Sequence, residues 1–161
     1  MDYCATHPDA VVWFMASERI LALYSDAFHL SEPGAKSRAG GHFYFKDKTD
    51  RESNNGAMLT LSKISKHVMS SASEAGTAAL FLNCKAVIPL RIALEEMGHP
   101  QTKTPVITDN SSAAGLINKT VIPKRANAHD MRFNWLKCSE AQEMFDLIWK
   151  RVKTIKLTIA S

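Results

Sequence analysis

The segment Ser70 to Asn83 constrains the fold more than any other part of this sequence. Its residues favour a helix, and apolar side chains lie nearly all round that helix between Ala75 and Leu82. A helix that is apolar on every side is buried, so other elements must pack around it. At 161 residues, the chain is long enough for one well-packed domain and too short for two comfortable ones. We therefore expect a single domain with this helix at its centre.

The residues before this helix favour strands. Alternating apolar and polar positions predict strands at 20–25, 42–46 and 56–62. Asp26, a turn-forming residue, is expected to close the first strand, and residues 30–41 are expected to form the loop after it. Three strands joined by polar links indicate an antiparallel meander.

After the helix, helical and strand patterns alternate. Pro89 is expected to begin a second helix that ends at Gly98, because proline suits the first position of a helix and glycine its end. Residues 104–109 form a short apolar run that ends in Asp109 and predicts a fourth strand. Asn110 or Ser111 could cap a short helix directly after it.

The last part of the chain predicts one more helix and one more strand. Residues 129–145 form the helix, with Met131, Trp135 and Cys138 at helical spacing, and residues 145–150 form the strand. We expect Trp135 and Trp149 to lie in the core rather than to serve as platforms for stacking bases. The complete order of elements indicates an α/β domain with a mixed sheet and helices packed on it.

Composition limits where the protein works. No apolar run approaches the roughly 20 residues of a membrane span, and the start MDYCATHPDA lacks the basic and apolar regions of a secretory signal. The three cysteines are far apart and fit neither a disulfide framework nor a zinc site. We expect an intracellular, cytoplasmic protein without a membrane partner.

Positive charge is concentrated in the last third of the chain. From Lys119 onward there are nine lysines or arginines and four acids, whereas the whole chain has a net charge of +4. A basic flank of this kind could follow a polyanion such as a nucleic-acid backbone, with Lys124, Arg125 and Arg132 as candidate phosphate contacts. A solvated surface explains the same residues, so both interpretations stay open.

Two acids stand out by their position at the ends of predicted strands. Asp26 follows the first strand and Asp109 follows the fourth. Ligands of open α/β sheets bind at strand ends beside a change in strand order. Two carboxylates brought together there repel each other unless a cation lies between them, and Mg²⁺ prefers such oxygen ligands. Each acid could equally be a turn residue or a helix cap.

Four motifs occur together in an order that resembles a known family. They are SDA at residues 25–27, SSASEA at 70–75, TDNSSA at 108–113 and DMRFNWL at 130–136. Their order and spacing resemble the RNase H domain of copia-type retrotransposon polyproteins. The resemblance runs from about Asp2 to Arg151. Residues 1–16 resemble the linker after a polymerase domain, and residues 152–161 depart from the family.

The resemblance implies a fold and an activity. The fold is an RNase H-like α/β domain whose five-stranded mixed sheet has three antiparallel strands, two further strands parallel to the first, and helices on both faces. Family members hydrolyse the RNA strand of RNA/DNA hybrids, with two Mg²⁺ ions roughly 4 Å apart held by four carboxylates. They recognise the shape of the duplex and the 2′-hydroxyl of RNA rather than its sequence.

Carrying the four acids over to this sequence gives an incomplete set. Asp26 and Asp109 match the first and third acids of the family. The second is usually the latter glutamate of an EAE run, which places it at Gly76, whereas Glu74 matches the first glutamate of that run. Residues two apart on a helix point about 200° away from each other. We therefore interpret Glu74 as a first-turn carboxylate that favours the helix dipole, with a shifted register, in which Glu74 is the ligand, as the alternative.

The fourth acid of the family has no counterpart either. The chain ends WKRVKTIKLTIAS without an acid after Asp146, and Asp146 itself lies inside the last predicted strand. Another reading frame of the same codons could encode an Asn-x-Ala-Asp motif of the family. A frameshifted C-terminus is therefore one hypothesis, which the nucleotide sequence of the gene would test.

These observations leave three hypotheses for the function. The first is a ribonuclease H that uses Asp26, Asp109 and Glu74 with Mg²⁺, impaired by two missing acids. The second, which we favour, is a degenerate copy that keeps the fold and weak binding of an RNA/DNA hybrid or duplex. The third is an unrelated α/β domain, which would be supported if the helix from Ser70 did not cross the sheet beside Asp26 and Asp109.

Overall fold

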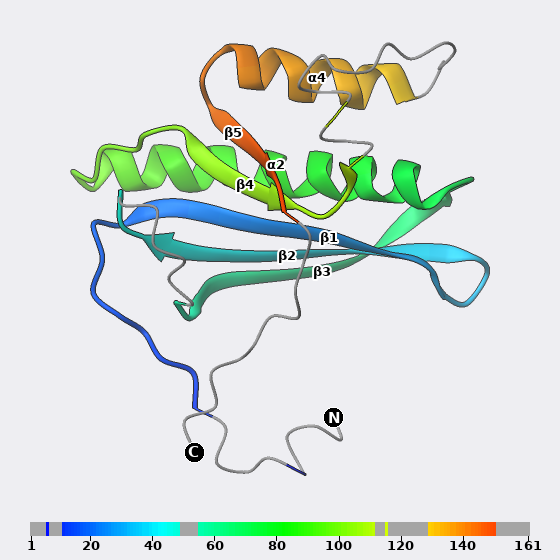
Figure 1. Cartoon of the computed structure of the whole chain (residues 1–161), viewed down its shortest axis with the longest axis horizontal. Coiled ribbons are helices and arrows are strands. Elements are labelled where there is room, and N and C mark those ends of the chain that lie inside the picture. The colour runs from blue at the N-terminus through cyan, green and yellow to red at the C-terminus, as the bar shows by residue number, and fades with distance from the viewer. Residues whose placement is uncertain (1–5, 7–10, 49–54, 112–114, 116–128, 151–161) are drawn as a thin grey trace.

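The computed structural model describes residues 6, 11–48, 55–111, 115 and 129–150. In chain order its elements are β1 (Ile20–Glu32), β2 (Lys36–Lys46), β3 (Ala57–Val68), α2 (Ala72–Glu96), β4 (Thr104–Thr108), α4 (His129–Ala141) and β5 (Phe145–Trp149). The strands form one sheet in the order β3-β2-β1-β4-β5 (Figure 1). β1, β2 and β3 are antiparallel, while β4 runs parallel to β1 and β5 parallel to β4. The expected five-stranded mixed sheet is confirmed.

The two described helices form layers on one face of the sheet. α2 packs along β1 and β2, and α4 lies on α2 and β5 (Figure 1). The side chains enclosed between them include Leu21, Leu23, Phe43, Leu80 and Val87, all with no exposed surface. The central position expected for the apolar helix is therefore confirmed. Segments that could add a helix to the opposite face lie outside the described residues.

α2 is one helix of 25 residues rather than two shorter ones. The prediction that one helix ends at Asn83 and another begins at Pro89 is wrong, because Pro89 lies inside the continuous helix. Proline in a helix interior removes one backbone hydrogen bond, yet α2 buries residues on both sides of it, Val87 and Leu94. Packing against the sheet extends the helix beyond its local sequence signals. The predicted end at Gly98 is confirmed, since Gly98 has φ +83° and its N–H donates to the carbonyl of Glu95.

β1 and β2 are longer than their sequence patterns predict. β1 does not stop at Asp26 but continues to Glu32, so most of the predicted loop at residues 30–41 belongs to strands. Gly40 and Gly41, at the end of the predicted loop, lie in β2, and Gly41 serves a close approach: a β-carbon there would lie 2.6 Å from Oδ1 of the buried Asn83. Glycine is required by packing at this position and not by a turn.

In the last helix and strand, the buried side chains are not all those that the sequence predicts. The last helix stops at Ala141, and the strand after it is confirmed as β5. Phe133 and Leu136 supply the buried face of α4, whereas Met131 is 81% exposed. Trp135 packs edge-on against Phe81 as expected. The expectation that Trp149 lies in the core is wrong, because its side chain is half exposed.

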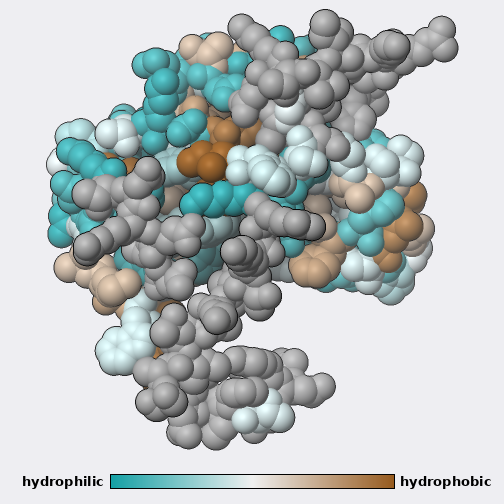
Figure 2. All heavy atoms as spheres, viewed as in Figure 1, coloured by the Kyte–Doolittle hydropathy of each residue, from teal (hydrophilic) through white to brown (hydrophobic). Residues whose placement is uncertain are grey.

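Length and composition alone would allow α2 to cross a membrane. This corrects the expectation that no segment approaches a membrane span. Its apolar side chains pack on β1 and β2, which accounts for their composition without a bilayer. Figure 2 shows hydrophilic residues over much of the described surface on one side of the molecule, with smaller hydrophobic patches between them.

Candidate functional site

A cavity of about 300 Å³ lies where β1, the end of β4 and the start of α2 meet. Small residues allow this junction, because Ala27 of β1 packs against Ala75 and Ala78 of α2. The polar residues and the glycine that line the cavity are Asp26, Ser73, Gly76, Thr108, Asp109, Asn110 and Ser111. The helix from Ser70 therefore crosses the sheet beside the two aspartates. An unrelated α/β domain would have been favoured if this helix lay elsewhere, so the structure does not favour that hypothesis.

The pairing of β1 with β4 brings the two aspartates together. Ser25 lies opposite Thr108 in this parallel pair, so Asp26 and Asp109 are the next residues along their strands. Side chains alternate between the faces of a sheet, and neighbouring strands lie about 4.8 Å apart. Both carboxylates consequently line the same cavity. The sequence-based expectation that these two acids meet is confirmed, although Asp26 lies within a strand instead of at its end.

The two carboxylates influence each other electrostatically. Partial burial raises the pKa of Asp109 above its ordinary value, and the negative charge of Asp26 raises that pKa further. The carboxylate of Asp26 accepts a hydrogen bond from the backbone N–H of Ala27 at 2.6 Å. Two repelling carboxylates on one cavity wall favour any cation or proton that enters between them.

We expect the Asp26→Asn substitution to lower the pKa of Asp109, because it removes the nearby negative charge that raises this pKa together with burial. The folded pKa of Asp109 is raised, so the free energy of unfolding decreases as the pH rises from the ordinary aspartate pKa through the raised one. Carbon-13 NMR titration of the Asp109 carboxyl group measures the shift. The Asp146→Asn variant, which changes an exposed acid at the other end of β5, serves as the control. An unchanged Asp109 pKa in Asp26→Asn would show that the two carboxylates do not interact.

Glu74 does not line this cavity. Its carboxylate turns back to Ser70 and accepts hydrogen bonds from the backbone N–H at 2.8 Å and from the hydroxyl at 2.7 Å. Ser71 is the N-cap of α2, and its hydroxyl accepts from the N–H of Glu74 at 3.1 Å. The interpretation of Glu74 as a first-turn carboxylate is thus supported by its contacts. The alternative that Glu74 is a metal ligand stays a prediction.

Gly76 lies on the cavity wall, buried in the second turn of α2. A β-carbon at this position would lie 1.8 Å from Nδ2 of Asn110, which is far inside any possible contact distance. Asn110 reaches over α2 and donates from Nδ2 to the carbonyl of Ser73 at 3.2 Å. Because Gly76 has no side chain, Asn110 packs in the space that a side chain at this position would take.

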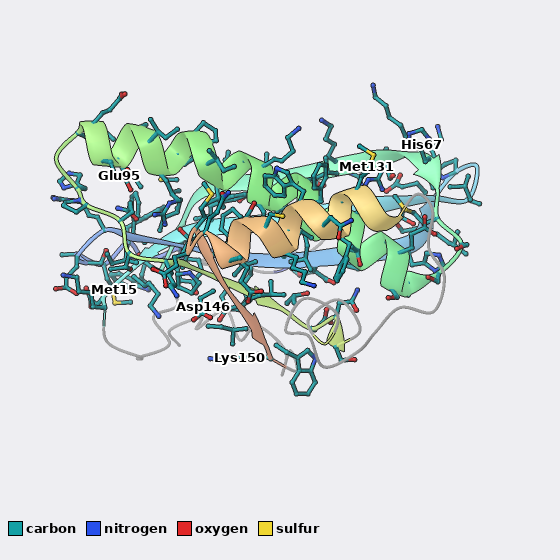
Figure 3. The ribbon with its side chains drawn as sticks, turned by 90° about the horizontal axis from the view of Figure 1, so that it is seen from above. Met15, His67, Glu95, Met131, Asp146 and Lys150 are labelled. Carbon is teal, nitrogen blue, oxygen red and sulfur yellow. The ribbon has the colours of Figure 1, made fainter. Side chains whose placement is uncertain are left out.

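The other predicted site residues lie elsewhere. Asp146 pairs with Pro105, three positions before the pair Thr108 and Trp149, which places it about 10 Å along the strand from the cavity. Figure 3 labels Asp146 on β5 and Lys150 directly after its end. Arg132 lies half-buried in the first turn of α4. Lys124 and Arg125 fall outside the described residues, so the role of all three basic residues in binding nucleic acid stays a prediction.

A search of solved structures finds the same architecture in several proteins. LC11-RNase H1, isolated from compost by a metagenomic approach, is 10% identical over 83% of this chain and 84% of its own, with a TM-score of 0.58. The same enzyme in complex with RNA/DNA hybrid is 12% identical, with coverage of 86% and 88% and a TM-score of 0.58. The foamy viral protease-reverse transcriptase in complex with dsDNA is 13% identical over 88% of each chain, with a TM-score of 0.57. The chain has the ribonuclease H fold. No protein-family model and no curated protein sequence matches it.

Sequence reasoning missed the roles of two residues at the site in this ribonuclease H fold. Asn110 was considered only as a helix cap, although it crosses to α2. Trp149 was assigned to the core, but its indole N–H donates to the carbonyl of Asp109 at 3.1 Å. A buried glycine in a helix interior is the signal that could have located Asn110, because such a residue often marks the close approach of another segment.

Proposed function

We propose that this chain is a degenerate RNase H domain that binds RNA/DNA hybrids without cleaving them efficiently. One observation carries the proposal: Asp26 and Asp109 share a cavity with Gly76, the position at which the family resemblance places a further acid. The fold supports it too, since one neighbouring structure is a complex with RNA/DNA hybrid and another a complex with dsDNA. The motifs of the sequence favour an origin in a copia-type retrotransposon polyprotein, downstream of a polymerase domain.

Mg²⁺ is the cofactor that the family resemblance implies, so the residues present must be tested against it. Asp26 and Asp109 offer hard oxygen ligands of the kind that Mg²⁺ prefers. Among the described residues, no group of three or more His, Cys, Asp or Glu side chains could hold a metal ion. The carboxylate of Glu74 is engaged with Ser70. These residues do not fit a pair of ions on four carboxylates, and we infer no catalytic step through metal.

Binding without efficient cleavage is still chemically reasonable for this chain. Most of the affinity for a duplex comes from contacts with its phosphates, which depend on basic residues and not on the carboxylates of the cavity. The net charge of +4 and the basic last third of the chain favour such contacts. Loss of an acid from the cavity even reduces the repulsion of a nearby phosphate.

The decisive measurement is cleavage of a labelled RNA/DNA hybrid in Mg²⁺ or Mn²⁺, beside binding of the same hybrid measured by fluorescence anisotropy. We expect the protein to cleave no faster than its Asp26→Asn variant. We also expect it to bind the hybrid with an affinity that falls by at least tenfold between 50 and 200 mM salt, in line with contacts to several phosphates. Double-stranded DNA and double-stranded RNA of equal length show whether the hybrid is preferred.

Two results would overturn the proposal in different ways. Cleavage that disappears in Asp26→Asn would show a working nuclease, and its further loss in Glu74→Gln would make Glu74 the missing ligand. Failure of the folded protein to bind any duplex at low salt would remove the nucleic-acid function altogether. Circular dichroism of each variant shows that it is folded, so a negative result can be interpreted.

A further inference from the structure

The side chain of Trp149 lies at the end of β5, next to residues that line the cavity. In the register of β4 and β5, Trp149 is opposite Thr108, a cavity residue that directly precedes Asp109. Phe145 and Leu147 lie on the same face of β5, because side chains alternate along a strand, and both are buried. Trp149 is 49% exposed. The apolar face of β5 thus ends in an exposed indole next to the cavity.

The indole of Trp149 is held in this exposed place. Its N–H donates to the carbonyl of Asp109 at 3.1 Å, so the polar edge of the ring is satisfied by a residue of the cavity. The backbone N–H of Lys150 donates to the carbonyl of Thr108 at 3.0 Å, which continues the pairing with β4 beyond Trp149. Within the part of the chain that the structure describes, no other aromatic ring packs against this indole. The protein therefore fixes the ring, while about half of its surface can contact a ligand.

The charges beside Trp149 favour an uncharged group on the ring. Asp26 and Asp109 are acids that line the cavity, and their negative charge repels a phosphate placed next to them. A nucleobase is uncharged and flat, and it stacks on an aromatic side chain whatever its identity. In a duplex each base is already stacked between its neighbours, so the ring can take only a base that has left the duplex. These arguments favour an unpaired nucleotide at this position over the backbone of the duplex.

We propose that Trp149 stacks an unpaired base of bound nucleic acid beside the cavity. The inference rests on the proposed function for its ligand and adds a preference to it. RNA/DNA hybrids that carry a single-stranded overhang bind more tightly than blunt hybrids, because the first unpaired base lies on the indole. Loss of one such stack weakens binding by about fivefold or more.

The preference is tested by fluorescence anisotropy of one labelled hybrid with and without a single-stranded DNA overhang. We expect the overhang to raise the affinity of the wild type by about fivefold or more. Trp149→Leu should lose most of this gain and bind the blunt hybrid as the wild type does. Trp149→Phe keeps a ring without the N–H that bonds to Asp109, so it should retain part of the gain. Trp13→Leu is the matched control, because Trp13 is 59% exposed and lies before β1, and it should behave like the wild type.

A second measurement follows the ring itself. A base stacked on an indole quenches its fluorescence, so a short thymidine oligonucleotide should quench the emission of the wild type and of Trp13→Leu. The same oligonucleotide should leave the emission of Trp149→Phe unchanged. Circular dichroism shows that each variant is folded. This measurement does not depend on binding of a duplex.

The outcomes separate this inference from the proposed function. If the blunt hybrid binds but the overhang adds nothing, or adds as much in Trp149→Leu as in the wild type, the inference is wrong and the proposed function stands. Quenching that persists in Trp149→Phe overturns the inference as well. If no duplex binds while the oligonucleotide quenches Trp149, the proposed function fails and the stack on Trp149 is confirmed. Absence of both binding and quenching overturns both.

Discussion

Replacing Phe43 with alanine is expected to lower the free energy of unfolding by about 3 to 5 kcal/mol. Phe43 of β2 has no exposed surface and lies in the core cluster between the sheet and α2, with Leu23, Leu80 and Val106 as other members. Truncation removes a large apolar side chain from water-free surroundings and leaves a cavity that the neighbouring strands can fill only in part. This is the largest single loss that we expect from the sheet.

Urea unfolding followed by circular dichroism measures this change. Phe28→Ala is the matched control, because Phe28 lies on the adjacent strand β1 and its side chain is 61% exposed. We expect that variant to change the free energy of unfolding by no more than about 0.5 kcal/mol. Equal effects at the two positions would contradict the position of the core, and with it the placement of α2 on this face of the sheet.

Replacing Asn83 with alanine is expected to lower the free energy of unfolding by about 2 to 4 kcal/mol. Asn83 of α2 is 1% exposed. Its Nδ2 donates to Oγ of Ser25 and to the carbonyl of Gly40, both at 2.8 Å. Without the amide, the buried Ser25 hydroxyl and the partly buried Gly40 carbonyl would both lose this donor, and the space beside Gly41 would be empty.

This substitution also reaches the candidate site, because Ser25 precedes Asp26 and Gly40 is the partner of Asp26 in β2. Asn83 thereby fixes the part of β1 that presents Asp26 to the cavity. Thermal and urea unfolding measure the effect, with Asn134→Ala on the exposed side of α4 as the control. A loss below about 1 kcal/mol would show that the amide is not needed and that water or neighbouring groups replace it.

The parts of the fold that the sequence predicts are those with strong local patterns. The order of the strands and the burial of the apolar helix follow from periodicity together with the family resemblance. The meeting of Asp26 and Asp109 follows from their positions after predicted strands, where ligands of open α/β sheets bind, together with the same resemblance. The end of α2 at Gly98 was also predictable, because a positive φ and a cap are properties of a single short segment.

The errors arose where packing outweighs local preference. Pro89 suggested the start of a helix, but α2 passes through it because Val87 and Leu94, on either side of it, are buried. Residues 30–41 are predicted as a loop, whereas Gly41 lies in β2 and is needed for the close approach of Asn83. Likewise, Gly76 was interpreted only as a lost acid, and its contact with Asn110 depends on a turn that follows β4. Each of these residues is explained by a contact with residues that are distant in the sequence. Propensities of single residues carry no information about such contacts.

The strand order also determines how the candidate site can form during folding. β1, β2 and β3 follow one another and pair as neighbours, so they can assemble from local contacts. β4 pairs with β1 although β2, β3 and α2 lie between them in the chain, and the link between the backbone N–H of Leu21 and the side chain of Gln101 spans 80 residues. Long-range pairing of this kind forms slowly. Asp26 is therefore expected to be in place before Asp109 arrives, and a kinetic intermediate would hold the meander without the cavity.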